Sequence, residues 1–297
     1  MRVPAPIAAI LQEPPPSMAF EISEAGISVA RLSAKTELDF RPLKAGVLGI
    51  TPLKDNVLLP DELAIAVREA APQNGNRKRR DAALILPDYS TRISVLDFDN
   101  FPSDQKEQLA LIRFRIRKSV PFDVESAAIS YFAQQSESKK YDVVVVVAPL
   151  EVISRYEAPF RAAGINPGLV TTSSLSALNL IEEGGITVVA KISGRVLTVM
   201  VLRNGRLKLV RCLEVHANDV AEIAADLYPT FVYIEDNIGA KADRLLLCGF
   251  GEHLDAARQQ FQRELAVEVE PVRSPLGPPG ENNAGLLGYL RSVARDN

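Results

Sequence analysis

The strongest local constraint on this chain is the Asn204-Gly205 pair, which lies between two β-rich runs. RVLTVMVL (195–202) precedes the pair, and RLKLVRCLEV (206–215) follows it. Asn-Gly in this setting is typical of a two-residue β-hairpin turn, because both residues accept the positive φ that the turn requires. GITVVAKI (185–192) comes just before, so the sequence predicts three consecutive antiparallel strands.

The rest of the second half alternates helices with strands. Asp219 is expected to cap a helix, because its side chain can accept hydrogen bonds from the backbone N–H groups of the first turn. This helix would run from 219 to about 235, followed by a strand at 244–248, a helix at 253–265, a strand at 267–270 and a helix at 284–293. The predicted order of elements is βββαβαβα.

The first half repeats this order less regularly. FEISEAGISVARL (20–32) predicts two short strands about an Ala25-Gly26 turn. The elements expected after them are a third strand near 40–46, a helix at 61–71, a strand at 82–87, a strand at 168–172 and a helix at 174–181. Two copies of one domain plan therefore follow each other along the chain.

An additional segment interrupts the first copy. Residues 92–164 are predicted to form a strand, a helix that begins at Ser103 and runs to Lys118, two strands, and a helix that ends at Gly164. We interpret this segment as a small α/β module inserted at about 91–165. The fold class is therefore α/β, with a proline-rich tail at 1–18, a first lobe at 19–183 and a second lobe at 184–297.

Composition limits the functions that the chain can have. Of its 297 residues, 47% are hydrophobic and 24% are charged, enough to bury a core in each of two domains. A net charge of -3 gives no electrostatic reason to expect nucleic acid as a partner. With two cysteines and two histidines there is neither a disulfide framework nor a zinc-ligand spacing, which favours a cytoplasmic location.

The first residues, MRVPAPIAAILQEPPPS, are expected to lie outside the fold as a tail. Their prolines interrupt any continuous helix or signal-peptide core, and no run in the chain reaches the length of about 18 apolar residues needed to span a membrane. The apolar residues 7–11 could dock in a groove of this molecule or of a neighbouring copy. Self-association is therefore one expectation for this tail.

Three stretches (86–122, 142–181 and 245–272) resemble the actin-like family, in the bacterial branch of the pilus-assembly protein PilM and the cell-division protein FtsA. The resemblance spans roughly residues 19–290. It implies two ribonuclease-H-like lobes about a nucleotide cleft, and a cytoplasmic protein peripheral to the inner membrane in a type IV pilus or type II secretion platform. It also implies a partner, a PilN-like bitopic membrane protein whose cytoplasmic N-terminal peptide binds in a groove beside the inserted module.

The residues at the nucleotide positions depart from this family pattern. Actin-like ATP sites place an aspartate at the end of each lobe's first strand to hold magnesium, followed by a glycine that lets backbone N–H groups approach the phosphates. By the resemblance, the aspartate positions fall on Glu21 and Lys191, the glycine positions on Ser23 and Ser193, and the usual lysine on Ser28. A lysine at the second aspartate position repels the metal ion.

Three glycines are the other remnants of this nucleotide site. Gly194 follows the second hairpin's first strand, and Gly249 and Gly251 form a GxG turn that is equally typical of an ordinary strand-to-helix connection. The segment 210–244 has room for one helix only, whereas the family usually carries an extra subdomain there that forms a wall of the adenosine pocket. We expect Glu21 and Lys191 to meet directly or through one water and to hold the lobes together.

These departures favour a non-catalytic scaffold without catalytic residues, metal or nucleotide cofactor. The alternative is an active actin-like ATPase or a kinase-like enzyme in which Glu21 replaces the aspartate as a metal ligand. His216 and His253 have no nucleophile motif nearby. Asp97, Asp99 and Asp104 are expected to be turn and cap residues.

The helix 103–118 is the predicted partner-binding element, on a surface between the first lobe and the module. Its spacing places Lys106, Arg113 and Arg117 near one face. Leu109, Ile112 and Ile116 would form its buried stripe. A solvated basic face is the other interpretation, and the basic loop 74–80 is likewise interpreted as solvated or as a contact for anionic lipid or a partner.

Overall fold

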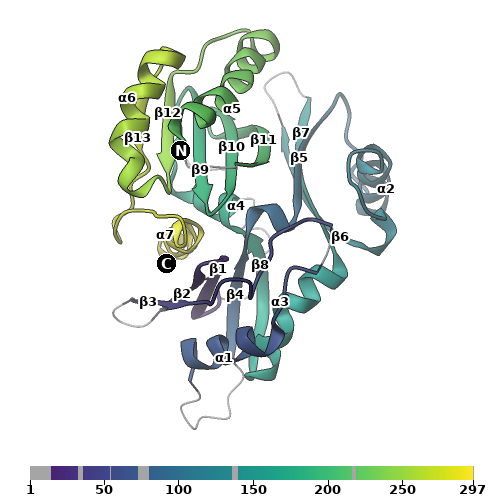
Figure 1. Ribbon diagram of the computed structural model, residues 1–297. Coiled ribbons are helices and arrows are strands. Elements are labelled where there is room, and N and C mark those ends of the chain that lie inside the picture. The colour runs from purple at the N-terminus through teal and green to yellow at the C-terminus, as the bar shows by residue number, and fades with distance from the viewer. Residues whose placement is uncertain are drawn as a thin grey trace.

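The computed structural model describes residues 15–32, 36–53, 55–72, 80–135, 140–215 and 219–296. Three sheets and seven α-helices form this part of the chain, with two larger sheets in separate lobes and a third, smaller sheet beside them (Figure 1). Most of the predicted tail, most of the basic loop 74–80, and His216 lie outside the described residues. Within the described residues, no helix is both long and apolar enough to cross a membrane.

The first lobe is built on a five-stranded sheet. Its spatial order is β3 (Glu37–Pro42), β2 (Gly26–Arg31), β1 (Met18–Ile22), β4 (Arg80–Leu86) and β8 (Ile165–Thr172). Helices α1 (Pro60–Ala70) and α3 (Leu150–Ala162) cover one face, where Phe20 packs edge-on against Phe160. The third strand is earlier than the 40–46 predicted, because it pairs with β2 and ends at Pro42, which has no N–H to donate.

The second lobe repeats the first sheet strand for strand. The order is β11 (Arg206–Glu214), β10 (Val196–Arg203), β9 (Ile186–Ser193), β12 (Arg244–Cys248) and β13 (Glu268–Pro271). Helices α5 (Val220–Tyr233) and α6 (Leu254–Leu265) pack on its outer face. The predicted Asn204-Gly205 turn joins β10 to β11, with positive φ at both residues, and Asp219 caps α5. The duplicated α/β fold class is confirmed.

Register shows how closely the copies correspond. Glu21 of β1 pairs with Ser28 of β2, and Lys191 of β9 pairs with Thr198 of β10. In both hairpins the partners are seven positions apart. The duplication therefore places an acidic and a basic side chain at equivalent positions of the two hairpins.

The inserted module is a three-stranded antiparallel sheet with one helix on it. The order is β5 (Arg92–Phe98), β7 (Tyr141–Pro149) and β6 (Ala127–Gln135), and α2 (Gln105–Ile116) covers one face. The helix is capped by Asp104, whose Oδ1 accepts hydrogen bonds from the N–H groups of Lys106 (2.9 Å) and Glu107 (3.0 Å). The sequence predicted the cap of this helix at Ser103, which is wrong by one position, because Asp104 makes these bonds.

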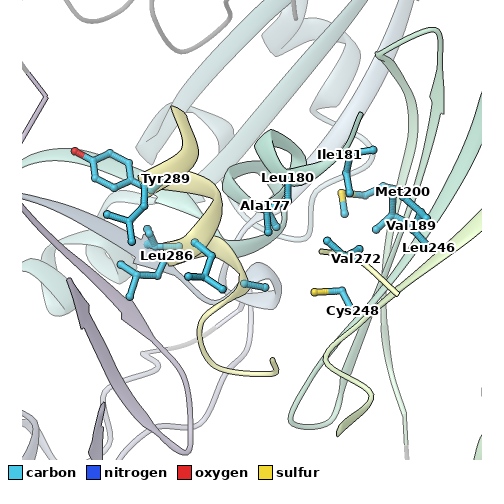
Figure 2. Close-up of a cluster of buried hydrophobic side chains, with 14 of the residues drawn as sticks. Ala177, Leu180, Ile181, Val189, Met200, Leu246, Cys248, Val272, Leu286 and Tyr289 are labelled. Atoms are coloured by element: carbon cyan, nitrogen blue, oxygen red, sulfur yellow. The ribbon is translucent and has the colours of Figure 1, made fainter. Parts of the chain in front are cut away.

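Two helices from different copies lie between the two large sheets. They are α4 (Ser173–Ala177), extended by the 3₁₀ turn Leu178–Leu180, and α7 (Ala284–Asp296). Figure 2 shows Leu286 and Tyr289 of α7 on one side, Ala177 and Leu180 near the centre, and Met200 and Leu246 of the second sheet on the other. The predicted helix 174–181 is thus one short α-turn plus a 3₁₀ turn, and the last helix of the second copy packs on the first lobe.

Small residues allow this close packing. The first sheet presents Ala19, Ala30 and Ala83 to the core between the lobes. A Cβ at Gly288 would collide with the carbonyl of Ser176, and one at Gly285 would lie 2.8 Å from the Cα of Ser173. The backbones of α4 and α7 therefore touch, and Ser176 Oγ donates a 2.7 Å hydrogen bond to the Gly285 carbonyl.

Candidate functional site

The first strands of the two lobes end at a shared cleft, where a buried ion pair joins the lobes. Lys191, 1% exposed at the end of β9, places its Nζ 3.0 Å from Oδ2 of Asp88. Asp88 begins the 3₁₀ turn Asp88–Ser90 directly after β4, so the pair connects the second lobe to the first. Asp88 Oδ2 also accepts from Thr198 Oγ1 (3.0 Å), and Oδ1 accepts from the N–H of Ser174 (2.6 Å).

Glu21 is buried on the first-lobe side of the cleft and interacts electrostatically with Lys191. Its carboxylate accepts hydrogen bonds from Ser173 Oγ and from the N–H of Leu286 (2.7 Å) in the first turn of α7. The free N–H groups of a helix N-terminus favour a negative charge there. Hydrogen bonds from α4 and α7 therefore fix the Glu21 carboxylate at the junction of β1, α4 and α7.

Burial and charge shift the ionisation of both groups. Burial opposes the charged form of Lys191, but the carboxylates of Asp88 and Glu21 outweigh it and raise the pKa of the ammonium. Burial raises the pKa of Glu21, while Lys191 and the hydrogen bonds from Ser173 and Leu286 lower it. The two groups act on each other electrostatically without forming an ion pair.

The expectation of a direct contact between Glu21 and Lys191 is wrong, because neither a hydrogen bond nor an ion pair joins these two described side chains, and a contact through one water stays a prediction. Among the described side chains, the ion-pair partner of Lys191 is Asp88. This carboxylate lies in the turn that follows β4, the neighbour of β1 in the first sheet. Asp88 is not among the residues that the sequence predicted for this site. The signal was present in the stretch LILPDY, where an acid directly follows a buried strand whose end faces the cleft.

The turns of the two hairpins make up the rest of the cleft. Ser23 Oγ bonds the backbone of Gly26 within its own turn, and Ser28 Oγ donates a 2.6 Å hydrogen bond to the Asn282 carbonyl of the second lobe. Gly194 lies opposite Glu24, since a Cβ on it would be 3.6 Å from Oε2 of Glu24. Ser193 and Gly194 line a cavity of about 50 Å³ together with Ser23 and Asp88.

The GxG turn is explained by packing. Gly249 has φ 80°, and a Cβ there would collide with the Ile192 carbonyl of the neighbouring strand. Gly251 has φ 49° and begins the turn into α6. Both positions suit glycine because of the left-handed backbone, and Gly249 also because of the close approach of β9.

These residues do not fit a magnesium-nucleotide complex. Mg²⁺ takes oxygen ligands, and one of the two carboxylate positions holds an ammonium group that is already paired. Ligand pockets typically measure about 300–1,000 Å³, whereas the cavity between the hairpins measures about 50 Å³.

A second and larger opening lies where the module meets both lobes. This groove has a volume of about 220 Å³. Its walls are formed by β6 and β7 of the module, by β8 and α4, by the second-lobe hairpin at Gly205, and by α7. Apolar side chains dominate these walls: Phe132, Val144, Val146, Leu169, Leu175, Leu202 and Leu207.

Two strand edges border this groove. β8 is the last strand of the first sheet, and β6 is the last strand of the module sheet. Consecutive residues of each strand, 169–172 and 130–132, line the groove, so backbone as well as side chains form its walls. An edge strand presents unpaired N–H and C=O groups that an extended peptide can pair with.

The module is fixed to the second lobe beside the groove. Gln134 of β6 donates through Nε2 to the Leu207 carbonyl and accepts from the Leu207 N–H, both at 3.0 Å. Lys208, the residue after Leu207 on β11, forms an ion pair with Asp142 of β7. These contacts attach the module to β11 beside the groove.

The predicted partner-binding residues lie on the other face of the module sheet. Side chains along a strand alternate between faces. Val143, Val145 and Val147 pack towards α2, whereas Val144 and Val146 line the groove. Lys106 and Arg117 are exposed on the α2 side, and Arg113 is half-buried, 4.0 Å from Glu125.

Of the expected buried stripe on α2, Ile112 and Ile116 are buried and Leu109 is half-buried. Of the three acidic residues expected in turns or caps, Asp104 is a helix cap and Asp99 lies in a bend after β5, whereas Asp97 lies within β5, so the expectation is wrong for Asp97. Asp104 caps α2, Asp97 lies 3.5 Å from Arg115, and Asp99 lies 2.8 Å from Lys140.

Comparison with known proteins agrees with this architecture. No protein-family model matches the sequence, and no curated protein matches it. A chain of the PilM–PilN type IV pilus biogenesis complex superposes with a TM-score of 0.76 at 18% identity, covering 93% of this chain and 98% of that one.

Two further solved structures share the fold at lower similarity. The cytoplasmic domain of EpsL, an inner-membrane component of the type II secretion system of Vibrio cholerae, gives a TM-score of 0.55 at 12% identity over 93% of this chain and 94% of that one. A Bacteroides thetaiotaomicron protein with an actin-like ATPase fold gives 0.57 at 12% identity, over 91% and 94%. The chain therefore has the actin-like ATPase fold in a PilM-like form.

Proposed function

We propose that this protein is a non-catalytic, PilM-like scaffold of a type IV pilus or type II secretion inner-membrane platform. In this role it lies in the cytoplasm at the membrane surface and binds the cytoplasmic N-terminal peptide of a PilN-like bitopic membrane protein. The similarity in fold to a chain of the PilM–PilN complex and to the EpsL cytoplasmic domain supports the class of assembly.

The groove is the observation that carries the proposal. It combines an apolar lining of about 220 Å³ with two strand edges. Apolar side chains of a peptide would enter the cavity while its backbone paired with β6 or β8. This chemistry selects a short extended segment rather than a small polar metabolite.

The cleft supports the non-catalytic part. Binding of a metal-nucleotide complex would have to break the buried Lys191–Asp88 pair and enlarge a cavity of about 50 Å³. Breaking a buried pair costs several kcal/mol. Titration calorimetry with Mg-ATP is therefore expected to show no binding tighter than about 100 μM, which corresponds to roughly 5 kcal/mol. Tighter binding would support the enzyme alternative.

Peptide binding tests the scaffold role. A labelled peptide from the cytoplasmic N-terminus of the PilN-like protein is titrated with the full chain and followed by fluorescence anisotropy. Phe132→Arg places a charge in the groove and is expected to weaken binding at least about tenfold, since a buried unpaired charge is costly. Equal affinity for wild type and Phe132→Arg would remove the groove as the site.

Two controls test the opposite face of the module. Phe114→Arg changes the same residue type on α2, where Phe114 is 76% exposed, and is expected to bind like wild type. Arg113→Glu/Arg117→Glu tests the basic face of α2. A loss of binding in this variant alone would move the partner site from the groove to α2.

A further inference from the structure

The chain enters its fold at the rim of the groove. The carbonyl of Pro16 accepts a 3.0 Å hydrogen bond from the hydroxyl of Tyr289, and Tyr289 itself lines the groove. Pro16 is buried there beside β8, since a Cβ built on Gly168 would lie 3.9 Å from its Cγ. The described part of the chain therefore begins next to this opening, at Pro15.

The tail has the length and composition to occupy it. Residues 12–15 alone span up to about 13 Å when extended, which is long enough for the apolar run Ile7-Ala8-Ala9-Ile10-Leu11 to reach the groove. Prolines at positions 4, 6 and 14–16 exclude a helix and favour an extended backbone, the form that pairs with a strand edge.

The groove offers matching groups. Thr172 lines it, and its buried Oγ1 has no hydrogen-bond partner within the described residues. A peptide backbone supplies such a partner. Glu182 and Glu183 lie on the same lining, and the tail carries the positively charged Arg2.

We propose that residues 7–11 of this chain bind in the groove of the same molecule and compete with the partner's peptide. The inference rests on the proposed function for the identity of the competitor. The contact between the tail and the groove does not depend on the proposed function. Because a tethered segment acts at an effective concentration of about millimolar, the tail lowers the apparent affinity of any peptide for the same groove.

The test uses a synthetic peptide of residues 1–14 as the probe, added to full-length chains and followed by anisotropy. Wild type, whose groove is already occupied, is expected to bind the probe at least about tenfold more weakly than Ile7→Asp/Ile10→Asp, whose own tail cannot dock. Val3→Asp/Ala5→Asp carries the same charge change outside residues 7–11 and is expected to behave as wild type. Adding Phe132→Arg to the Ile7→Asp/Ile10→Asp chain is expected to abolish binding of the probe.

Equal binding of the probe to wild type and to Ile7→Asp/Ile10→Asp, or no binding to either, would overturn the proposal. Sedimentation velocity separates docking within one molecule from docking in a neighbour. A dimer that disappears in Ile7→Asp/Ile10→Asp would also overturn it, by assigning the tail to a second copy. If the probe binds as expected and the PilN-like peptide does not, the partner assignment fails and the tail contact stands. If only the PilN-like peptide binds, the tail contact fails and the partner assignment stands.

Discussion

The cleft and the groove are both gaps between the same two lobes, but the described residues fill the cleft and leave the groove open. In the cleft, Lys191 is paired with Asp88, Glu21 accepts hydrogen bonds from the first lobe and from α7, and the remaining cavity is about 50 Å³. In the groove, apolar walls surround about 220 Å³ and two strand edges are unpaired within their sheets. Buried charges that have internal partners stabilise a closed state, whereas apolar surface and free strand edges favour an external ligand.

Replacing Lys191 by methionine is the strongest way to break this comparison. The change leaves the Asp88 carboxylate buried without its ammonium partner, so the free energy of unfolding is expected to fall by about 3–5 kcal/mol. Urea unfolding followed by circular dichroism measures it.

The matched control for Lys191 lies on the same hairpin. Arg195 pairs with Glu214 at 3.2 Å, but both side chains are exposed, so Arg195→Met is expected to cost about 0–1 kcal/mol. Asp88→Asn combined with Lys191→Met should recover part of the loss, because both charges are then absent. A cost below about 1 kcal/mol for Lys191→Met would mean that the cleft is not held by this pair.

The groove side of the comparison is tested by Gln134→Ala. This change leaves the N–H and C=O of Leu207 buried without partners and is expected to cost about 1–3 kcal/mol. It also removes one of the two contacts described between the module and β11, so binding of the PilN-like peptide should weaken. Gln260→Ala, which removes one exposed hydrogen bond to Glu264, is the control and should stay within about 0.5 kcal/mol of wild type.

The sequence predicted the fold well because its strongest signals are local. The Asn204-Gly205 turn, the Asp219 cap and the alternating strands each act over a few residues, and they specify the duplicated order. The position of α7 on the first lobe could not be predicted this way, because the contacts of Gly285 and Gly288 with α4 join residues more than a hundred positions apart.

The cleft was partly predictable and the groove was not. The positions of Glu21 and Lys191 at the cleft follow from the resemblance to the actin-like family, but the partner of Lys191 lies in the turn after β4, which the two aspartate positions of that family pattern do not include. The groove arises from side chains of six strands and two α-helices, and in the sequence the apolar residues among them are indistinguishable from core residues.

The protonation of Glu21 sharpens the description of the cleft. Its folded-state pKa is raised above the ordinary 4.5 by burial, so the folded state binds this proton more tightly than the unfolded state. The contribution of Glu21 to stability is therefore greatest below about pH 4.5 and is lost as pH rises through the folded-state pKa.

Glu21→Gln removes this titration. The difference in unfolding free energy between wild type and Glu21→Gln is expected to move in favour of the variant as pH rises, by at most about 1.4 kcal/mol per pH unit. Urea titrations between pH 4.5 and 8 measure the trend. A difference that moves in favour of wild type would show that Lys191 and the hydrogen bonds outweigh burial.

The smallest expected effect is a rate, and it separates the cleft from the groove without requiring a change in overall stability. Burial raises the pKa of the Cys248 thiol to about 12, and Cys248 lies in the core between the lobes (Figure 2). At pH 8 a thiol with that pKa is ionised in roughly one molecule in 10,000, and only the thiolate reacts with iodoacetamide. Alkylation of Cys248 therefore requires the lobes to open locally. Lys191→Met, which breaks the cleft, should raise the alkylation rate measured by mass spectrometry, whereas Phe132→Arg in the groove should leave it unchanged. Equal acceleration by both changes would mean that the two gaps open together, and that the closed cleft and the open groove are not independent features of this fold.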